Sequence, residues 1–323
     1  QPSIAINKEK GDFVICWNAY EQSKANYRVY FQRYDEKGQA LNNLVKVNNE
    51  VVDLSKTKTD LVYGDPLNPI QKHKYFHTVT DVSMNNKSQF VVAWSSFNRD
   101  GSVNHIFFQQ YDSKGNSKGN ESKLGNPDKI NHHDPKVAID ENENFVVAWA
   151  TYKRQDDLPG KYKMDTGIFA QRFNSKGIEQ GNEIKVNSIN EGIKEEPAIS
   201  MNDAGNFIIS WSVYKIFKHT DSLKEAYSLG IFGQKFKADG TPDGKQISVS
   251  EAQNQIQSFP SVALDDKGSF IVSWQKEDFQ KDYHKSIFYR KFNANNSPAI
   301  KSTKGSNLEY KYRHNLAYSK NSF

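Results

Sequence analysis

The sequence predicts an all-β protein built from repeated four-stranded antiparallel sheets, and three observations support this prediction. All five tryptophans end the same apolar phrase, a second phrase follows each of them, and turns rich in Gly, Asn and Asp separate the segments. No stretch carries apolar residues at helical spacing over a length that would favour a helix. A fixed order of phrases indicates an array of similar units.

The tryptophan phrases define the units. They read GDFVICW, SQFVVAW, NFVVAW, GNFIISW and GSFIVSW, and they end at Trp17, Trp94, Trp149, Trp211 and Trp274. Runs upstream of each tryptophan phrase, such as PKVAI, predict a first strand, and the phrase itself predicts a second. Downstream runs such as IFAQRF predict a third strand, and a run that ends near Val47, Val186 or Val249 predicts a fourth. A repeat of about 50 residues with four strands is typical of a β-propeller blade, because one sheet cannot bury both faces until neighbours stack on them. A stack of β-sandwich domains is the alternative.

The predicted domain is a single β-propeller region over residues 1–323. Its complete repeats span about 1–49, 78–126, 133–188, 195–250 and 258–308, with an insertion at 50–77 and a partial sixth repeat at 312–323. Because the chain starts at Gln1 and the sixth repeat stops before its tryptophan, we expect a piece of a longer protein. The number of blades in the complete ring stays open.

Composition excludes several classes of protein. The chain has 43 basic and 38 acidic side chains, a net charge of +5 and one cysteine, which excludes a disulfide framework and a multi-cysteine zinc site. A mean hydropathy of -0.79 without a long apolar run argues against membrane insertion. Basic and acidic residues alternate in the loops, so we expect no nucleic-acid partner.

The order P-x-V-A-x-D-x-x-G-N-F-V-V-x-W, then G-I-x-x-Q-R-F-x-x-x-G, then V-N, resembles a repeat of large secreted and cell-surface proteins of bacteria and archaea. Units three to five match best, whereas unit two has Thr80 at the proline position and unit five has Arg290 in place of Gln. The resemblance implies propeller-like domains, a secreted or cell-surface location, and an adhesive or structural role. It transfers no catalytic residues.

Segment lengths predict a functional face. Pro135 to Trp149, Pro197 to Trp211 and Pro260 to Trp274 each span 14 positions, whereas the second-to-third connections and the links between units vary. In an up-and-down sheet these variable connections emerge on one face, which we expect to bind the ligand through loops at 48–79, 150–167 and 212–230. The alternative is that insertions are merely tolerated there.

These loops are rich in tyrosine and basic residues, which suit glycan or protein surfaces. The expected ligand-binding residues are Tyr152, Lys153, Arg154, Tyr162, Tyr214, Lys218, His219, Tyr227 and His77. A competing interpretation is that several of these rings only pin the loops. The sequence thus favours a non-catalytic extracellular binding or adhesion module, and not an enzyme, with a glycan or a surface protein as partner. A structural subunit of a surface layer or filament is one alternative.

A propeller-type glycoside hydrolase is the other alternative, because glycosidic cleavage needs paired carboxylates. Asp81, Asp134 and Glu196 fall at equivalent or adjacent positions, at the mouths of three consecutive first strands. We find no nucleophile-elbow, phosphate-loop or H-E-x-x-H motif.

Other motifs favour structural roles. We expect the tryptophans to form blade-to-blade core, with Cys16 as a small buried filler. No cofactor is expected: turns at 140–144, 202–206 and 265–269 only partly match a calcium loop and are typical of hairpins. His132 and His133 beside Asp134, with His77, match no zinc spacing.

Overall fold

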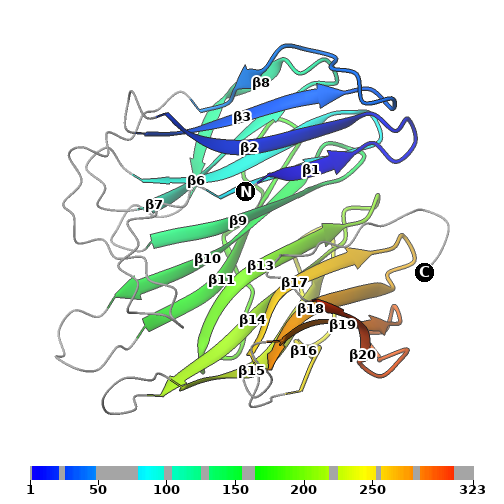
Figure 1. The fold of residues 1–323 in the computed structure, drawn as a ribbon. Coiled ribbons are helices and arrows are strands. Elements are labelled where there is room, and N and C mark those ends of the chain that lie inside the picture. Colours follow the sequence, from blue (N-terminus) through cyan, green and yellow to red (C-terminus); the bar gives the residue numbers. More distant parts are fainter. Residues whose placement is uncertain are drawn as a thin grey trace. The chain divides into compact units, whose positions relative to one another are not determined.

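In the part of the chain that the structure describes, β-strands alternate with turns and irregular segments (Figure 1). The computed structural model describes residues 2–21, 26–48, 79–97, 104–124, 131–154, 164–217, 225–251, 256–278 and 284–308. They form five four-stranded antiparallel sheets, each with its strands in sequence order, which confirms the predicted all-β propeller fold. The insertion at 50–77 and the partial repeat at 312–323 lie outside the described residues. Nowhere in these ranges is there a helix with the length and hydropathy to cross a membrane.

We number the sheets as blades 1 to 5. Blade 1 holds β1 (Ser3–Ile6), β2 (Phe13–Glu21), β3 (Asn26–Tyr34) and β4 (Val45–Lys46). Blade 2 holds β5 (Thr80–Met84), β6 (Phe90–Phe97), β7 (Asn104–Tyr111) and β8 (Ser117–Leu124). Blade 3 holds β9 (Asn131–Ile139), β10 (Phe145–Arg154), β11 (Met164–Phe173) and β12 (Ile184–Lys185). Blade 4 holds β13 (Ile193–Met201), β14 (Phe207–Phe217), β15 (Glu225–Phe236) and β16 (Ile247–Ser248). Blade 5 holds β17 (Ile256–Leu264), β18 (Phe270–Asp278), β19 (His284–Phe292) and β20 (Thr303–Leu308).

The chain divides into two compact units. The first holds blades 1 and 2 and most of blade 3, and the second holds blades 4 and 5 together with Met164–Phe169 and β12. In the first unit, β5 contacts both β1 and β9, and in the second β13 contacts β17. The first strands of neighbouring blades therefore lie next to one another within each unit.

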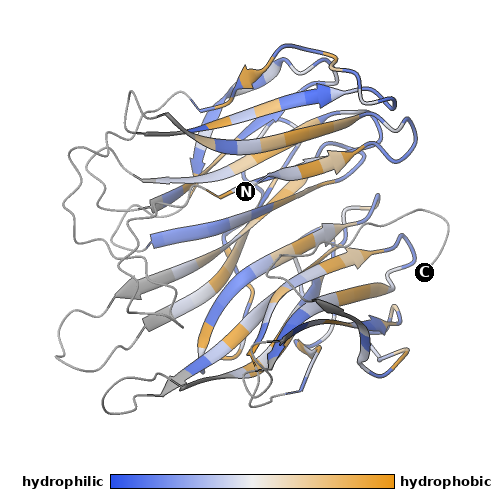
Figure 2. Ribbon diagram, in the orientation of Figure 1, coloured by the Kyte–Doolittle hydropathy of each residue, from blue (hydrophilic) through white to orange (hydrophobic). Residues whose placement is uncertain are grey.

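Apolar side chains fill the space between neighbouring blades. In the first unit, Cys16 and Phe31 of blade 1 pack against Phe90 and Trp94 of blade 2. Cys16 is fully buried, as expected of a small filler. Figure 2 shows that most of the hydrophobic stretches lie on strands, where they alternate with hydrophilic ones.

The second unit repeats this packing. Ile208 and Val249 of blade 4 pack against Phe270 and Trp274 of blade 5. The four tryptophans of blades 2 to 5 are at most 1% exposed, which confirms their core role. Trp17 of blade 1 is only half-buried.

The insertions in blades 3 and 4 differ from the expected loops, because much of their length is strand. β14 and β15 stay paired as far as Phe217 and Glu225, and β10 runs to Arg154. The aromatic and β-branched residues of this hairpin favour strand, and continued pairing satisfies their backbone groups. Only 155–163 and 218–224 lie outside the described residues.

Candidate functional site

Blades 3, 4 and 5 share a backbone irregularity near the start of their first strand. The register with the second strand shifts there in β9, β13 and β17. At each shift the residue before a proline has a left-handed backbone: Asp134 with φ of 50°, Glu196 with 56° and Phe259 with 51°. Such a conformation costs about 1–3 kcal/mol for a residue with a side chain. Bulges and strained residues are enriched at functional sites, so this position is the candidate site in each blade.

The remaining left-handed residues other than glycine need no functional explanation. Among the described residues they are Ser88, Glu143 and Asn296. All three close tight turns between strands, where this conformation is common. The irregularity at Asp134, Glu196 and Phe259 differs because it interrupts a strand.

The carboxylate of Glu196 is held by three donors in the second unit. Its Oε2 accepts hydrogen bonds from Tyr214 Oη, Ser212 Oγ and the backbone N–H of Phe259, each with 2.7 Å between the heavy atoms. Ser212 and Tyr214 are buried on β14, while Phe259 belongs to the next blade. Hydrogen bonds to a charged acceptor are the strong ones, so they fix the orientation of this carboxylate.

Tyr214 acts as a donor in this cluster. Burial, and then the negative charge of Glu196, hold the pKa of the Tyr214 phenol well above its usual value. The phenol therefore keeps its proton and does not serve as a base near neutral pH.

Asp81 makes structural contacts in the first unit. Its Oδ1 accepts a hydrogen bond from Ser3 Oγ at 2.8 Å and lies 3.8 Å from Lys136 Nζ. Its Oδ2 accepts a hydrogen bond from the backbone N–H of Val137 at 3.0 Å. These contacts tie β5 to β1 and β9, so both carboxylate oxygens hold neighbouring blades together.

Asp134 lies beside a histidine. Its Oδ2 is 3.2 Å from His133 Nδ1, and its side chain is 26% exposed. A carboxylate next to an imidazole can orient the ring and support a proton transfer. Asp134 is thus the more accessible of the two aspartates proposed from the sequence, because the side chain of Asp81 is 16% exposed.

The structure describes only some of the residues that the sequence predicts to bind a ligand. The sequence predicts Tyr214 in an exposed loop, whereas the structure places it on a strand. Tyr214 is 3% exposed, because β14 continues through this position and its hydroxyl donates to Glu196. The other residues of that set on described strands are Tyr152, Lys153, Arg154 and Tyr227, at the outer ends of β10 and β15. Tyr162, Lys218, His219 and His77 lie outside the described residues.

The Asp-rich turns use their carboxylates internally. Asp140 Oδ1 accepts hydrogen bonds from the backbone N–H groups of Asn142 and Asn144, both at 2.8 Å. This is the geometry of an Asx turn, which agrees with the hairpin interpretation. Within the described ranges, no group of three or more His, Cys, Asp or Glu side chains could hold a metal ion.

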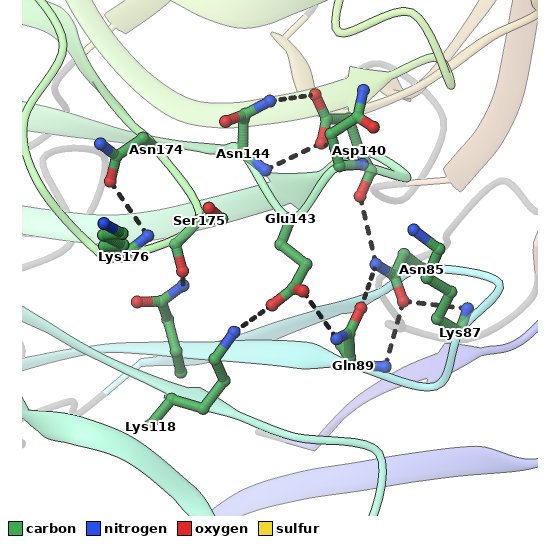
Figure 3. Close-up of polar contacts among 12 residues, drawn as sticks. Asn85, Lys87, Gln89, Lys118, Asp140, Glu143, Asn144, Asn174, Ser175 and Lys176 are labelled. Carbon is green, nitrogen blue, oxygen red and sulfur yellow. Dashed lines mark hydrogen bonds and ion pairs between the residues drawn. The ribbon is translucent and has the colours of Figure 1, made fainter.

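Neighbouring turns also interlock, as Figure 3 shows for blades 2 and 3. Asn85 Nδ2 donates to the carbonyl of Asp140 at 3.3 Å, and Gln89 Nε2 donates to Glu143 Oε1 at 2.7 Å. Glu143 Oε2 forms an ion pair with Lys118. These polar side chains join two blades at the end of the sheets opposite the bulges, so we assign them to stability.

Comparisons with known proteins come from structure alone, since no protein-family model and no curated protein matches the sequence. The chain is similar to a polysaccharide lyase of family PL25, an ulvan lyase, with a TM-score of 0.54 and 9% identity, over 96% of this chain and 73% of the lyase. It is also similar to an α-L-arabinanase of Penicillium chrysogenum, with a TM-score of 0.47 and 11% identity, over 94% and 92% of the two chains. For an endo-arabinase of Bacteroides thetaiotaomicron the TM-score is 0.39 and the identity 18%, over 85% of this chain and 88% of the endo-arabinase.

These likenesses correct the prediction of a non-catalytic adhesion module that is not an enzyme. The ulvan lyase, the match with a TM-score of 0.54, is an enzyme that acts on a polysaccharide, so the catalytic alternative replaces it below as a proposal. At such low identity the likeness itself establishes the fold, and the chain is an all-β propeller with four-stranded blades.

Proposed function

We propose that this chain is a carbohydrate-active enzyme of the glycoside hydrolase type, with Glu196 as a catalytic carboxylate. The observation that supports it is the cluster at Glu196: a carboxylate on a strained bulge, held at Oε2 by Tyr214, Ser212 and the Phe259 amide. Glycosidic cleavage uses a pair of carboxylates, and a carboxylate oriented in advance by fixed donors can supply one of them. The enzymes with similar folds act on arabinan and ulvan, which supports a polysaccharide as substrate.

The hydrogen bonds favour one role for Glu196 over another. Three donors each direct a hydrogen at Oε2, and hydrogen bonds donated to a carboxylate favour its charged form. A fixed negative charge serves as a nucleophile, as a base for water, or as a stabiliser of the positively charged sugar in the transition state. We therefore assign the charged role to Glu196, and not that of proton donor.

A second candidate reaction is elimination, which is favoured by the contact of His133 with Asp134. In that reaction a base removes a proton from the sugar carbon next to a uronic acid carboxylate, and the glycosidic oxygen leaves. An imidazole near neutral pH is a suitable base. Tyr214 is not, because its pKa lies well above the usual value for a tyrosine.

One assay separates the two reactions. Purified protein is incubated with arabinan, arabinoxylan, ulvan and a panel of other plant, algal and bacterial polysaccharides. Hydrolysis releases reducing ends without a new ultraviolet absorbance, whereas elimination releases both, because it leaves an unsaturated sugar. Absence of product from every polysaccharide in the panel would overturn the proposed function.

A matched pair of variants tests the residue. Glu196→Gln keeps the size of the side chain and removes its charge, and we expect kcat to fall by about 100-fold or more. Glu251→Gln makes the same change at an exposed position of the same unit and is expected to leave kcat unaltered. Equal loss in both variants, or loss in neither, would remove Glu196 from the catalytic assignment.

The proposed location follows from the substrate. Polysaccharides of this kind lie outside the cell, and the repeat phrases resemble those of secreted and cell-surface proteins. We infer that the chain acts as a secreted or surface-attached enzyme with glycans as partners.

A further inference from the structure

One aromatic side chain departs from the burial of its strand. Eight of the nine residues of β17 are buried, and Phe259 is the one that is partly exposed. The strand includes the buried polar residues Gln257, Ser258 and Ser261. Burial free energy favours the opposite distribution, because a phenylalanine gains more from leaving water than a serine does. The exposure of this ring is therefore a feature that needs an explanation.

The bulge provides the structural cause. The register of β17 with β18 shifts between Ser258 and Ser261, and Phe259 has a φ of 51°. A bulged residue is left out of the ladder and its side chain is aimed in a new direction. The strained backbone therefore places a ring at the position that Asp134 and Glu196 occupy in blades 3 and 4.

The ring also belongs to a residue that contacts the proposed catalytic carboxylate. The backbone N–H of Phe259 donates to Glu196 Oε2 at 2.7 Å. The Cβ atom of Phe259 is two bonds from that nitrogen, so its side chain begins close to the carboxylate. Aromatic rings offer sugars a rigid apolar surface, on which the C–H groups of one sugar face can pack.

We propose that Phe259 is a substrate-binding residue that stacks on a sugar ring next to the bond on which Glu196 acts. This inference rests on the proposed function and adds to it a subsite for the apolar face of a glycan unit. The backbone amide of Phe259 positions Glu196, and its ring positions the substrate. The two roles are separable, because substitution of the side chain leaves the amide donor in place.

The competing explanation is that the ring only fills space near blade 4. In the same blade Phe270 and Phe292 are fully buried and stack on each other, with 4.7 Å between their centroids. Phe288 is partly exposed and packs on Trp274, with 6.1 Å between the centroids, so burial alone does not separate the two explanations. A filling role predicts that removal of Phe259 lowers stability. A stacking role predicts that it lowers affinity for sugar.

The test uses Phe259→Ala and Phe259→Trp, with Tyr289→Ala as a control for a partly exposed ring on another strand of blade 5. Kinetics are measured on the polysaccharide that gives the highest turnover. Affinity is measured by calorimetry for an oligosaccharide of the same glycan, with each change placed in the Glu196→Gln background so that the ligand stays intact. Urea unfolding reports the stability of every variant.

We expect Phe259→Ala to raise KM and the dissociation constant by about tenfold, with kcat changed much less. Phe259→Trp should keep affinity within a few-fold, and Tyr289→Ala should leave it unchanged. The inference is overturned if Phe259→Ala binds as tightly as its parent, or if it loses stability and kcat with the same affinity.

Failure of this inference and failure of the proposed function give different results. If turnover depends on Glu196 but affinity is unchanged in the Phe259 variants, the stacking role of Phe259 is wrong and the proposed function stands. Sugar binding that depends on Phe259, without turnover in the parent protein, removes the catalytic proposal and keeps the subsite. A protein that neither binds nor cleaves any glycan overturns both.

Discussion

The carboxylate of Asp81 accepts a hydrogen bond from the backbone N–H of Val137, with 3.0 Å between Oδ2 and N. The donor belongs to the first strand of the next blade, and Ser3 of the previous blade donates to the other oxygen at 2.8 Å. One side chain therefore spans three blades of the first unit. Its place at the mouth of a strand suggests catalysis from the sequence, whereas its contacts indicate a structural role.

Asp81→Ala should thus lower the free energy of unfolding and have a smaller effect on turnover. Loss of a charged acceptor from two hydrogen bonds is expected to reduce the free energy of unfolding by about 1.5–3 kcal/mol. Urea denaturation measures this, with Glu179→Ala as a control at an exposed position of the same unit. Unchanged stability together with lost turnover would return Asp81 to the catalytic candidates.

Tyr214→Phe keeps the ring and removes one donor from Glu196. Because the hydrogen bond is buried and its acceptor is charged, we expect a loss of about 1.5–3 kcal/mol in the free energy of unfolding. Turnover should fall as well, since Glu196 would keep only Ser212 and the Phe259 amide among the three donors described. Tyr289→Phe is the matched control. A variant as stable and as active as the parent would show that the phenol does not hold the carboxylate.

Two buried histidines predict acid sensitivity. His105 and His132 lie with 6.3 Å between ring centroids, and neither His105 nitrogen has a hydrogen-bond partner among the described residues. Burial lowers the pKa of each to about 4; the charges of His105 and His133 act in the same direction on His132, and that of Lys123 on both. The fold therefore opposes protonation of both imidazoles.

The sign of the effect follows from this direction. Between the unfolded value of 6.5 and about 4, the unfolded chain binds more protons than the folded one. Stability should be fully present above pH 6.5 and fall on acidification, by up to about 1.4 kcal/mol per pH unit for each histidine. His105→Phe should flatten this dependence in urea titrations at pH 7 and pH 5. Identical slopes for variant and parent would contradict the prediction.

Cys16 should be inert in the folded protein. The thiol is fully buried between blades 1 and 2, and burial together with the charge of Asp81 raises its pKa to about 12. The thiolate is the reactive form, so a maleimide should label the native protein no faster than the protein unfolds. Mass spectrometry at increasing urea concentration tests this. Rapid labelling without urea would show that the junction of these blades opens.

The repeat frame is readable from the sequence because buried positions recur. Trp94 and Trp274 occupy equivalent core positions between blades, and an apolar phrase ending in a small residue and a large ring repeats only where such packing repeats. The order of the four strands follows from the same phrases. Asp134 and Glu196 were also visible, as acidic residues before the proline of a first strand.

The remaining features depend on contacts that sequence spacing does not contain. The pairing of Phe217 with Glu225 lengthens the β14–β15 hairpin, so Tyr214 lies in a buried strand and not in a loop. The left-handed backbone of Phe259 arises from a register shift, and the residue type at that position does not predict it, since β9 carries Asp there and β13 carries Glu. The feature that the three blades share in sequence is the proline that follows. The contact of Ser212 with Glu196 is likewise not visible in the sequence, because it depends on the register between β13 and β14.

The bulge before the proline has a consequence for how such a protein diversifies. The same backbone shape carries an acid in blade 3, a longer acid in blade 4 and an aromatic ring in blade 5. A duplicated blade therefore already contains the bulged backbone position. A change of one codon there replaces one side chain by another without a change in loop length. Under the proposed function, selection can vary reactivity and substrate preference at this position while the hairpins on either side stay unchanged.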